Sequence, residues 1–359
     1  MSLTAPLFLL NTMDEDENRS PWFERFEFIQ PLGSGGMGEV YLVEDKSNAN
    51  QLCVIKKIFN NKKGDLQAQA EMLRMGQREA EFLSKLNHRG IVKFLEDYYA
   101  AEENGYYVVM EYIPGSNLEE VMQKEGPIDS ETVVRIGLQC CDVLEYLHAA
   151  DPPIIYRDLK PSNLMLRPDG LVVFIDFGIA RDKPKDGPAT RVVTSGYSPP
   201  EQYFGKPEPR GDLYSLGATM HHLLTAVRPK PLTPCHPMKL NEKVIPELDA
   251  LIFHLTAQEK DERPPSARAV QFELFKIYKK IHPEFEIPAL DLDQDLEMGE
   301  KILKQEAQQS MKESRQNMKQ SAGHKSTAKK KESDTTGSDS DGLVNKVRNW
   351  FGNLGKRSD

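Results

Sequence analysis

A glycine-rich segment near the start of the chain, LGSGGMGEVYLVED, narrows the possible folds more than any other feature. Its glycines, Gly33, Gly35 and Gly38, have the G-x-G-x-x-G spacing that two unrelated nucleotide-binding designs share. In the dinucleotide-binding design the third glycine opens a helix, but here the run VYLV follows and favours a strand. A P-loop would end in Gly-Lys-Ser/Thr, which this segment does not. The sequence predicts a strand–turn–strand flap over phosphates, with Val40 as its apolar roof, although a glycine hairpin without ligand explains the motif almost as well.

Composition narrows the class of protein further. At 359 residues, the chain is long enough for one large two-lobed unit or two domains. Hydrophobic residues make up 39% and charged residues 28%, which suits a globular protein, and the net charge of -9 argues against a general nucleic-acid-binding surface. The four cysteines form no C-x-x-C pair, so neither a disulfide framework nor a zinc site is indicated.

The first residues, MSLTAPLFLLNTMDEDENR, contain a short apolar run with no basic residue before it. This is a poor secretory signal and is too short to span a bilayer. Met13, just before the acidic cluster, is as good a candidate for the start codon as Met1. We expect a cytoplasmic protein in a reducing compartment.

The texture of the sequence divides it into regions. Residues 26–112 contain strand-like runs and one helical stretch at about 66–86, whereas residues 113–281 are mainly helical. In the helical part, one face of ETVVRIGLQCCDVLEYLH is apolar. Residues 1–25 are expected to form an N-terminal extension and residues 282–341 a low-complexity linker, which is too polar to fold by itself.

Two charged residues of the strand-rich region are expected to pair. Lys56 lies in the strand pattern CVIKK, on a face that would look toward the glycine flap. Glu79 lies beside the apolar stripe of the helical stretch, where an acid needs a partner. Lys56 is the natural partner, although a solvated strand lysine is the simpler alternative.

The segment IIYRDLKPSNLML, residues 154–166, predicts a strand, a charged loop and a second strand. The loop would bring Asp158, Lys160 and Asn163 together, and the buried run LVVFID that follows would deliver Asp176. Asn163 and Asp176 offer the hard oxygen ligands that magnesium takes together with phosphates. Asp158 would then orient a hydroxyl, so the residues together predict phosphoryl transfer.

In this order along the chain, the motifs resemble the protein kinase superfamily, and more closely the eukaryotic-like serine/threonine kinases of bacteria, over residues 26–281. The resemblance implies an α+β fold with two lobes, an N-terminal β-sheet lobe with one helix at 26–112 and a mainly helical lobe at 113–281. It also implies a serine/threonine protein kinase that uses ATP and Mg²⁺, phosphorylates protein substrates and itself in bacterial-type signalling, and binds no nucleic acid.

The resemblance assigns a role to each site residue. Asp158 would be the catalytic base, Lys160 would steady the γ-phosphate, and Asn163 and Asp176 would hold magnesium. Lys56, held by Glu79, would contact the α- and β-phosphates. Met110 falls at the gatekeeper position, before the hinge. The residues expected around the nucleotide are Leu32, Gly33, Gly35, Gly36, Gly38, Val40, Lys56, Glu79, Met110, Glu111 and Ile113.

Other family features are expected to be structural. Glu201 and Arg263 would form an ion pair, and Asp212 would tie down the catalytic loop. Tyr156 replaces the histidine of the family's H-R-D motif and Pro199 replaces the alanine of A-P-E, and both changes leave activity plausible. The hydroxyls expected as autophosphorylation sites, which would meet Arg157, are those of Thr190, Thr194 and Ser195.

Residues 342–355, GLVNKVRNWFGNLG, place their apolar residues on one face of a predicted helix. An interfacial membrane helix, a helix that docks into a partner and a helix that docks onto the kinase itself fit this pattern equally well. The first would place the protein peripherally at the inner face of the membrane.

Two rivals to the kinase function remain. A pseudokinase scaffold would have lost the lysine, the base or a metal ligand, and none is lost here. A small-molecule kinase is disfavoured by Thr194 and the P-P-E segment, which suit a protein-substrate platform.

Overall fold

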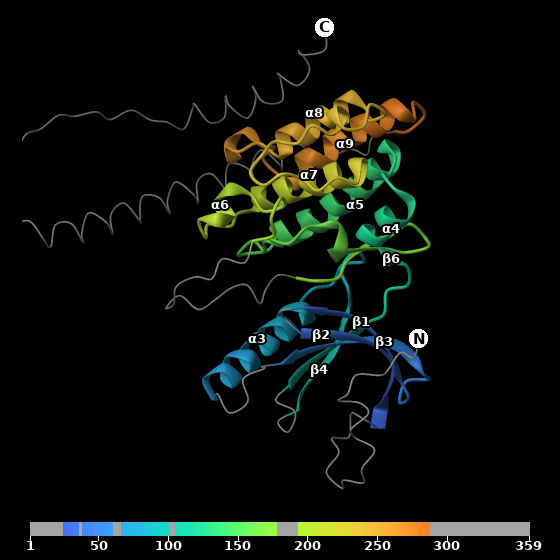
Figure 1. Cartoon of the computed structure of the whole chain (residues 1–359), viewed down its shortest axis with the longest axis vertical. Helices are drawn as coiled ribbons and strands as arrows, with labels where there is room; N and C mark the ends of the chain where they lie inside the picture. Colours follow the sequence, from blue (N-terminus) through green and yellow to red (C-terminus); the bar gives the residue numbers. More distant parts are fainter. Residues whose placement is uncertain (1–23, 36–37, 60–65, 101–104, 178–192, 287–359) are drawn as a thin grey trace, which may run out of the picture.

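The computed structural model describes residues 24–35, 38–59, 66–100, 105–177 and 193–286. They form a β-sheet lobe with one helix and a second, mainly helical lobe, as Figure 1 shows. The predicted two-lobed α+β fold is therefore confirmed. The predicted N-terminal extension up to residue 23, the linker from residue 287 and the segment 342–355 lie outside the described residues.

The first lobe is built on a five-stranded antiparallel sheet in the order β1-β2-β3-β5-β4. Its strands are β1 (Phe26–Gly35), β2 (Gly38–Asp45), β3 (Gln51–Phe59), β4 (Phe94–Ala100) and β5 (Gly105–Glu111). Helix α3 (Leu66–Ser84) packs against β3, β4 and β5. It buries Met72, Ala80 and Leu83 in the same core as Ile58 and Val108 of the sheet.

Strand β4 is the element that the sequence pattern did not reveal. Its sequence FLEDYYA alternates between half-buried and exposed positions, and the acidic pair Glu96 and Asp97 interrupts its apolar character. β4 lies at the edge of the sheet, where charged residues are tolerated and even useful because they discourage pairing with other chains.

The glycine flap is a β-hairpin between β1 and β2, so the prediction that a strand follows Gly38 is confirmed. Gly38 has a φ of 145°, a conformation that side chains rarely adopt. A Cβ atom at Gly38 would also lie 2.1 Å from the carbonyl oxygen of Lys57. Glycine is therefore required here by the packing of the hairpin on β3.

The second lobe contains the helices α4 (Leu118–Glu125), α5 (Ser130–His148), α6 (Pro200–Tyr203), α7 (Pro209–Thr225), α8 (Pro246–Leu255) and α9 (Ala267–Ile281). A small antiparallel sheet of β6 (Ser116–Asn117), β7 (Leu164–Leu166) and β8 (Val172–Phe174) lies on the side facing the first lobe (Figure 1). Helix α5 begins after Asp129, whose side chain accepts a hydrogen bond from the backbone of Thr132, and its predicted apolar face is buried.

Helix α7 lies at the centre of this lobe. Every residue from Gly211 to Thr225 is buried, so it has no solvent face of the kind that surface helices show. Helix α5 packs against both α7 and α9, and α8 packs against α7. The helix α9 ends at Ile281, and Phe285 then packs back onto the rings of Phe275 and Tyr278.

No helix within the described ranges has both the length and the apolar character that a membrane crossing requires.

Candidate active site

A buried lysine connects the two lobes. Lys56 Nζ on β3 lies 2.6 Å from Glu79 Oε1 on α3 and 3.0 Å from Asp176 Oδ1, just after β8. Burial alone would lower the pKa of Lys56, but the carboxylates of Asp176 and Glu79 outweigh it and raise the pKa above its ordinary value. The predicted pairing with Glu79 is confirmed, and the lysine carries its charge at neutral pH.

Asp176 differs from its two partners in exposure. The side chains of Lys56 and Glu79 are 11% and 3% exposed, whereas that of Asp176 is 40% exposed. A carboxylate held at one oxygen by a lysine and open to solvent elsewhere can take a further cationic ligand.

The register of the sheet places the expected nucleotide-facing residues together. Val40 lies directly opposite Lys56, and Met110 lies directly opposite Val54. Because opposite residues of antiparallel strands share a face, as do alternate residues of one strand, these four side chains lie on the same face of the sheet. Lys56 reaches Asp176 of the other lobe from this face.

The remaining expected nucleotide residues lie around this face. Leu32 and Gly33 are exposed on β1, which ends at Gly35, and a Cβ atom at Gly33 would meet nothing within 4 Å. Glu111 ends β5 with its N–H donating to the carbonyl of Lys93. The buried Ile113 follows two residues later. Gly36 lies outside the described residues, as do Gly178 and Thr190.

The segment between α5 and β7 gathers polar groups around Asp158. Asp158 Oδ2 accepts hydrogen bonds from Lys160 Nζ and Asn163 Nδ2, each at 2.9 Å. Asp158 Oδ1 accepts a hydrogen bond from Thr194 Oγ1 at 2.6 Å. The structure therefore brings together the three residues that the sequence grouped, and adds Thr194 to them.

Asn163 and Asp176 lie on adjoining segments, because the N–H of Ile175 donates to the carbonyl of Asn163 at 3.1 Å. The amide nitrogen of Asn163 is turned toward Asp158, which leaves its side-chain oxygen as a donor for a cation. In the described part of the chain, no three His, Cys, Asp or Glu side chains form a complete metal site. These two residues therefore suit a hard cation that completes its coordination with phosphate oxygens and water.

The prediction of a strand at 154–156 is wrong. The N–H of Ile154 donates to the carbonyl of Leu147, and the N–H groups of Tyr156 and Arg157 donate to the Asp212 carboxylate at 2.9 and 2.8 Å. With these partners the segment has no strand to pair with, and Arg157 adopts a φ of 68°. The predicted role of Asp212 in tying down this loop agrees with these distances.

His148 is a site residue that the sequence did not indicate. Its Nε2 lies 2.8 Å from Asp212 Oδ2, so the carboxylate contacts three donors. His148 is the last residue of α5, and nothing in the local pattern of that helix points to Asp212.

Tyr156, which replaces the family's histidine, lies in an aromatic stack. Its ring makes edge contacts with Phe174 at 4.8 Å and with Phe177 at 4.9 Å, and Phe177 contacts Phe82 of α3 at 5.6 Å. Its hydroxyl is buried and has no hydrogen-bond partner among the residues that the structure describes. Burial raises the pKa of Tyr156 well above its ordinary value, so the phenol is neutral.

The segment after Thr194 is fixed to α7. The N–H of Thr194 donates to Ser198 Oγ at 2.9 Å, and the hydroxyl of Ser215 donates to the carbonyl of Tyr197 at 2.8 Å. The Tyr197 hydroxyl lies 2.6 Å from His222 Nδ1. Ser198, Ser215 and His222 were not indicated by the sequence. We call residues 194–198 the acceptor platform, because Thr194 places it against Asp158.

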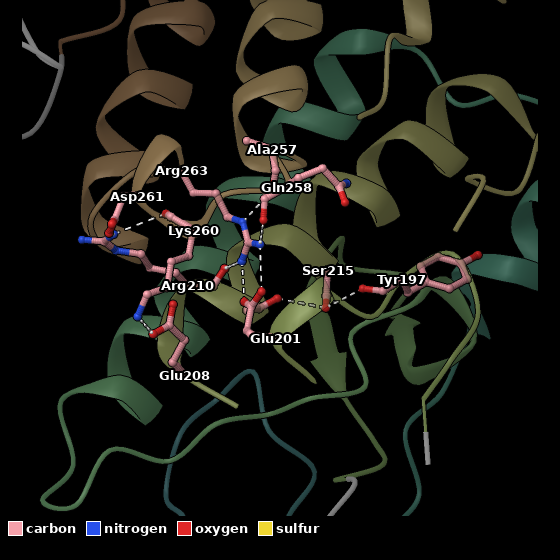
Figure 2. Close-up of polar contacts among 11 residues, drawn as sticks. Tyr197, Glu201, Glu208, Arg210, Ser215, Ala257, Gln258, Lys260, Asp261 and Arg263 are labelled. Carbon is pink, nitrogen blue, oxygen red and sulfur yellow. Dashed lines mark hydrogen bonds and ion pairs between the residues drawn. The ribbon is translucent and has the colours of Figure 1, made fainter. Parts of the chain in front are cut away.

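The predicted ion pair of Glu201 with Arg263 is present and almost fully buried. Two nitrogens of Arg263 contact the two carboxylate oxygens of Glu201 at 2.6 and 3.0 Å. Figure 2 shows the same guanidinium reaching the carbonyls of Ala257, Gln258 and Arg210. The side chain of Arg263 is 0% exposed, and its charge is compensated entirely by these partners.

Comparison with known proteins agrees with this geometry. A family profile described as a protein kinase domain matches residues 26–320. Serine/threonine-protein kinase PknB of Mycolicibacterium smegmatis is 31% identical over 73% of the chain, and PknA of a Nostoc species is 35% identical over 68%. The matched regions make up 44% and 46% of these relatives, so the chain spans less than half of their length.

A solved structure supports the fold independently. The PknI kinase domain of Mycobacterium tuberculosis superposes with a TM-score of 0.56 at 23% identity, covering 70% of this chain and 95% of that structure. At this identity the likeness shows the fold alone.

The unpartnered hydroxyl of Tyr156 leads to a first prediction. We expect Tyr156→Phe to stabilise the protein by about 1 kcal/mol, because it removes a buried hydroxyl that makes no hydrogen bond. Tyr197→Phe is the matched control, since it removes a hydroxyl that is bonded to His222, and we expect it to destabilise by about 1 kcal/mol. Thermal melting of the two variants beside the wild type decides, and equal losses in both would contradict the prediction.

A second prediction concerns the buried ion pair. Glu201→Ala leaves the Arg263 guanidinium buried without its carboxylate, and we expect a loss of about 3 kcal/mol in the free energy of unfolding. Lys280→Ala breaks an exposed ion pair with Glu247 and should cost less than about 0.5 kcal/mol. Urea unfolding of both variants measures the difference. Similar losses would show that Arg263 finds other compensation.

Proposed function

The chain belongs to the protein kinase family, and from this premise we propose that it transfers the γ-phosphate of ATP to serine and threonine hydroxyls of proteins. One observation carries the proposal: a threonine hydroxyl already donates to Asp158 Oδ1 at 2.6 Å, with Lys160 Nζ 2.9 Å from the other oxygen of the same carboxylate. A hydroxyl acceptor and a phosphate-neutralising cation are thus provided at one carboxylate.

Asp158 would orient the acceptor hydroxyl and take its proton. The carboxylate is nearly buried, with 2% of the residue exposed, and it is held at Oδ2 by Lys160 and Asn163. Oδ1 is the oxygen that faces Thr194, so a substrate hydroxyl would replace Thr194 there. Lys160 would then shield the negative charge that develops on the transferring group.

The residues fit ATP and magnesium. The site has a glycine flap, a lysine whose charge is fixed by two carboxylates, and the oxygen donors Asn163 and Asp176 on adjoining segments. Magnesium-bound ATP supplies the phosphoryl group and part of the charge compensation. Lys56 would hold the α- and β-phosphates, Asn163 and Asp176 would hold the metal, and Val40 and Met110 would border the base.

The two rivals fit less well. A scaffold without chemistry would have no use for the Lys56–Asp176 and Lys160–Asp158 pairs, both of which are intact. A small-molecule kinase would not need an acceptor platform fixed to α7 by three hydrogen-bonding residues.

The chemistry is tested by Asp158→Asn. Because the amide cannot accept the acceptor's proton, we expect transfer of labelled γ-phosphate to the enzyme itself and to a generic protein substrate to fall at least about a hundredfold. Thermal melting and nucleotide binding should change little, since Asn is nearly isosteric. Mapping the label to Thr190, Thr194 or Ser195 tests autophosphorylation. Equal labelling by the variant, or no labelling by an activated wild type, would refute the proposal.

We also propose that the protein is cytoplasmic and attaches peripherally to membranes through residues 342–355, which lie outside the described residues. The support is the sequence pattern, with Trp350 and Phe351 on the apolar face of the expected helix and Asn349 away from it.

Co-sedimentation with vesicles that contain anionic lipid tests this attachment. Trp350→Glu should reduce the bound fraction severalfold, whereas Asn349→Glu adds the same charge off the apolar face and should reduce it less. Equal binding by the wild type and by a chain that ends at residue 341 would reject membrane attachment and favour a protein partner.

A further inference from the structure

A basic, exposed loop lies beside the acceptor platform. The chain leaves α7 at Ala226 and continues as VRPKPL, in which Arg228, Lys230 and Leu232 are exposed. Pro229 is buried within this run, and its carbonyl oxygen would be 2.4 Å from a Cβ atom placed on Gly196. The backbone of the loop therefore lies directly against the acceptor platform, between two exposed cations.

The loop has a fixed shape. Ala226 and Leu232 have φ values of 53° and 51°, which non-glycine residues adopt rarely and only where the surroundings impose it. Arg228 pairs with Glu119 of α4 at 2.5 Å. The cations are thus presented on a strained, anchored segment.

The charges of the loop act on the platform itself. Arg228 and Glu119 both influence the pKa of Tyr197, whose hydroxyl is bonded to His222, so the ion pair lies next to the residues that fix the platform. Within the pair the cation is the accessible partner, since the side chain of Arg228 is 72% exposed and that of Glu119 is 22% exposed. Lys230 adds a second exposed cation with no ion-pair partner in the described part of the chain.

We propose that Arg228, supported by Lys230, selects protein substrates that carry an acidic residue next to the phosphorylated serine or threonine. This inference rests on the proposed kinase function and names the substrate class. A substrate hydroxyl at Asp158 places the neighbouring residues of its chain over the platform, beside Arg228. There a substrate carboxylate would share or replace Glu119 as the partner of the guanidinium. Preference for a basic neighbour, read by Glu119, is the opposite outcome.

The test compares peptides that differ only by Glu, Gln or Lys at each position flanking one acceptor. We expect the wild type to prefer Glu over Lys about threefold to tenfold in kcat/KM at one or more flanking positions. Arg228→Glu should abolish or reverse that preference. Lys279→Glu, which makes the same charge change at an exposed site on α9, should retain it.

A charge-swapped double variant separates recognition from structure. Arg228→Glu combined with Glu119→Arg rebuilds the ion pair while the exposed residue of the loop becomes acidic. Recognition predicts that this variant prefers Lys-containing peptides, whereas a structural role predicts wild-type preference.

Autophosphorylation measured in the same reactions reports whether the enzyme is active. An active enzyme with no preference among the peptides, a preference for Lys in the wild type, or an equal loss on all peptides in Arg228→Glu would overturn this inference alone. Absence of all labelling would refute the kinase function, and this inference with it.

Discussion

The buried carboxylate of Asp212 is the interaction on which the active site depends. It has no exposed surface, and a buried carboxylate is tolerated only when hydrogen bonds satisfy it. Here two successive backbone N–H groups and an imidazole do so. To present both N–H groups to one carboxylate, the backbone at Arg157 takes a left-handed conformation. That turn determines where Asp158 lies, and with it Lys160, Asn163 and Thr194.

Asp212 is the first member of a polar stripe on α7. Asp212, Ser215, Thr219 and His222 recur at intervals of three and four residues, so they lie along one side of the helix. Ser215 and His222 bond to Tyr197 of the acceptor platform, and the hydroxyl of Thr219 donates to the carbonyl of Leu159. One buried helix thus holds both the segment that carries the base and the segment that presents the acceptor, which keeps the two in register.

The sequence predicted what depends on local motifs. The flap, the lysine of β3, the acid of α3 and the residues around Asp158 could be placed because each lies in a short pattern whose chemistry limits its use. What the sequence could not predict depends on partners far along the chain. The segment 154–156 looks like a strand, yet its N–H groups bond to α5 and α7 instead of a neighbouring strand. The acidic residues of β4 concealed an edge strand, and His148 has no local signal at all.

The same separation of backbone and side chain explains why a tyrosine can replace the histidine before Arg157. The contact of this position with Asp212 is made by its backbone N–H, which any residue other than proline provides. The side chain instead fills the space between Phe174 and Phe177, and an aromatic ring does this with edge contacts on both sides. Phe177 directly follows Asp176, so this packing fixes the segment that carries the expected metal ligand. The departure from the family's histidine therefore changes the chemistry of a buried packing position and leaves the geometry of the reacting groups unchanged.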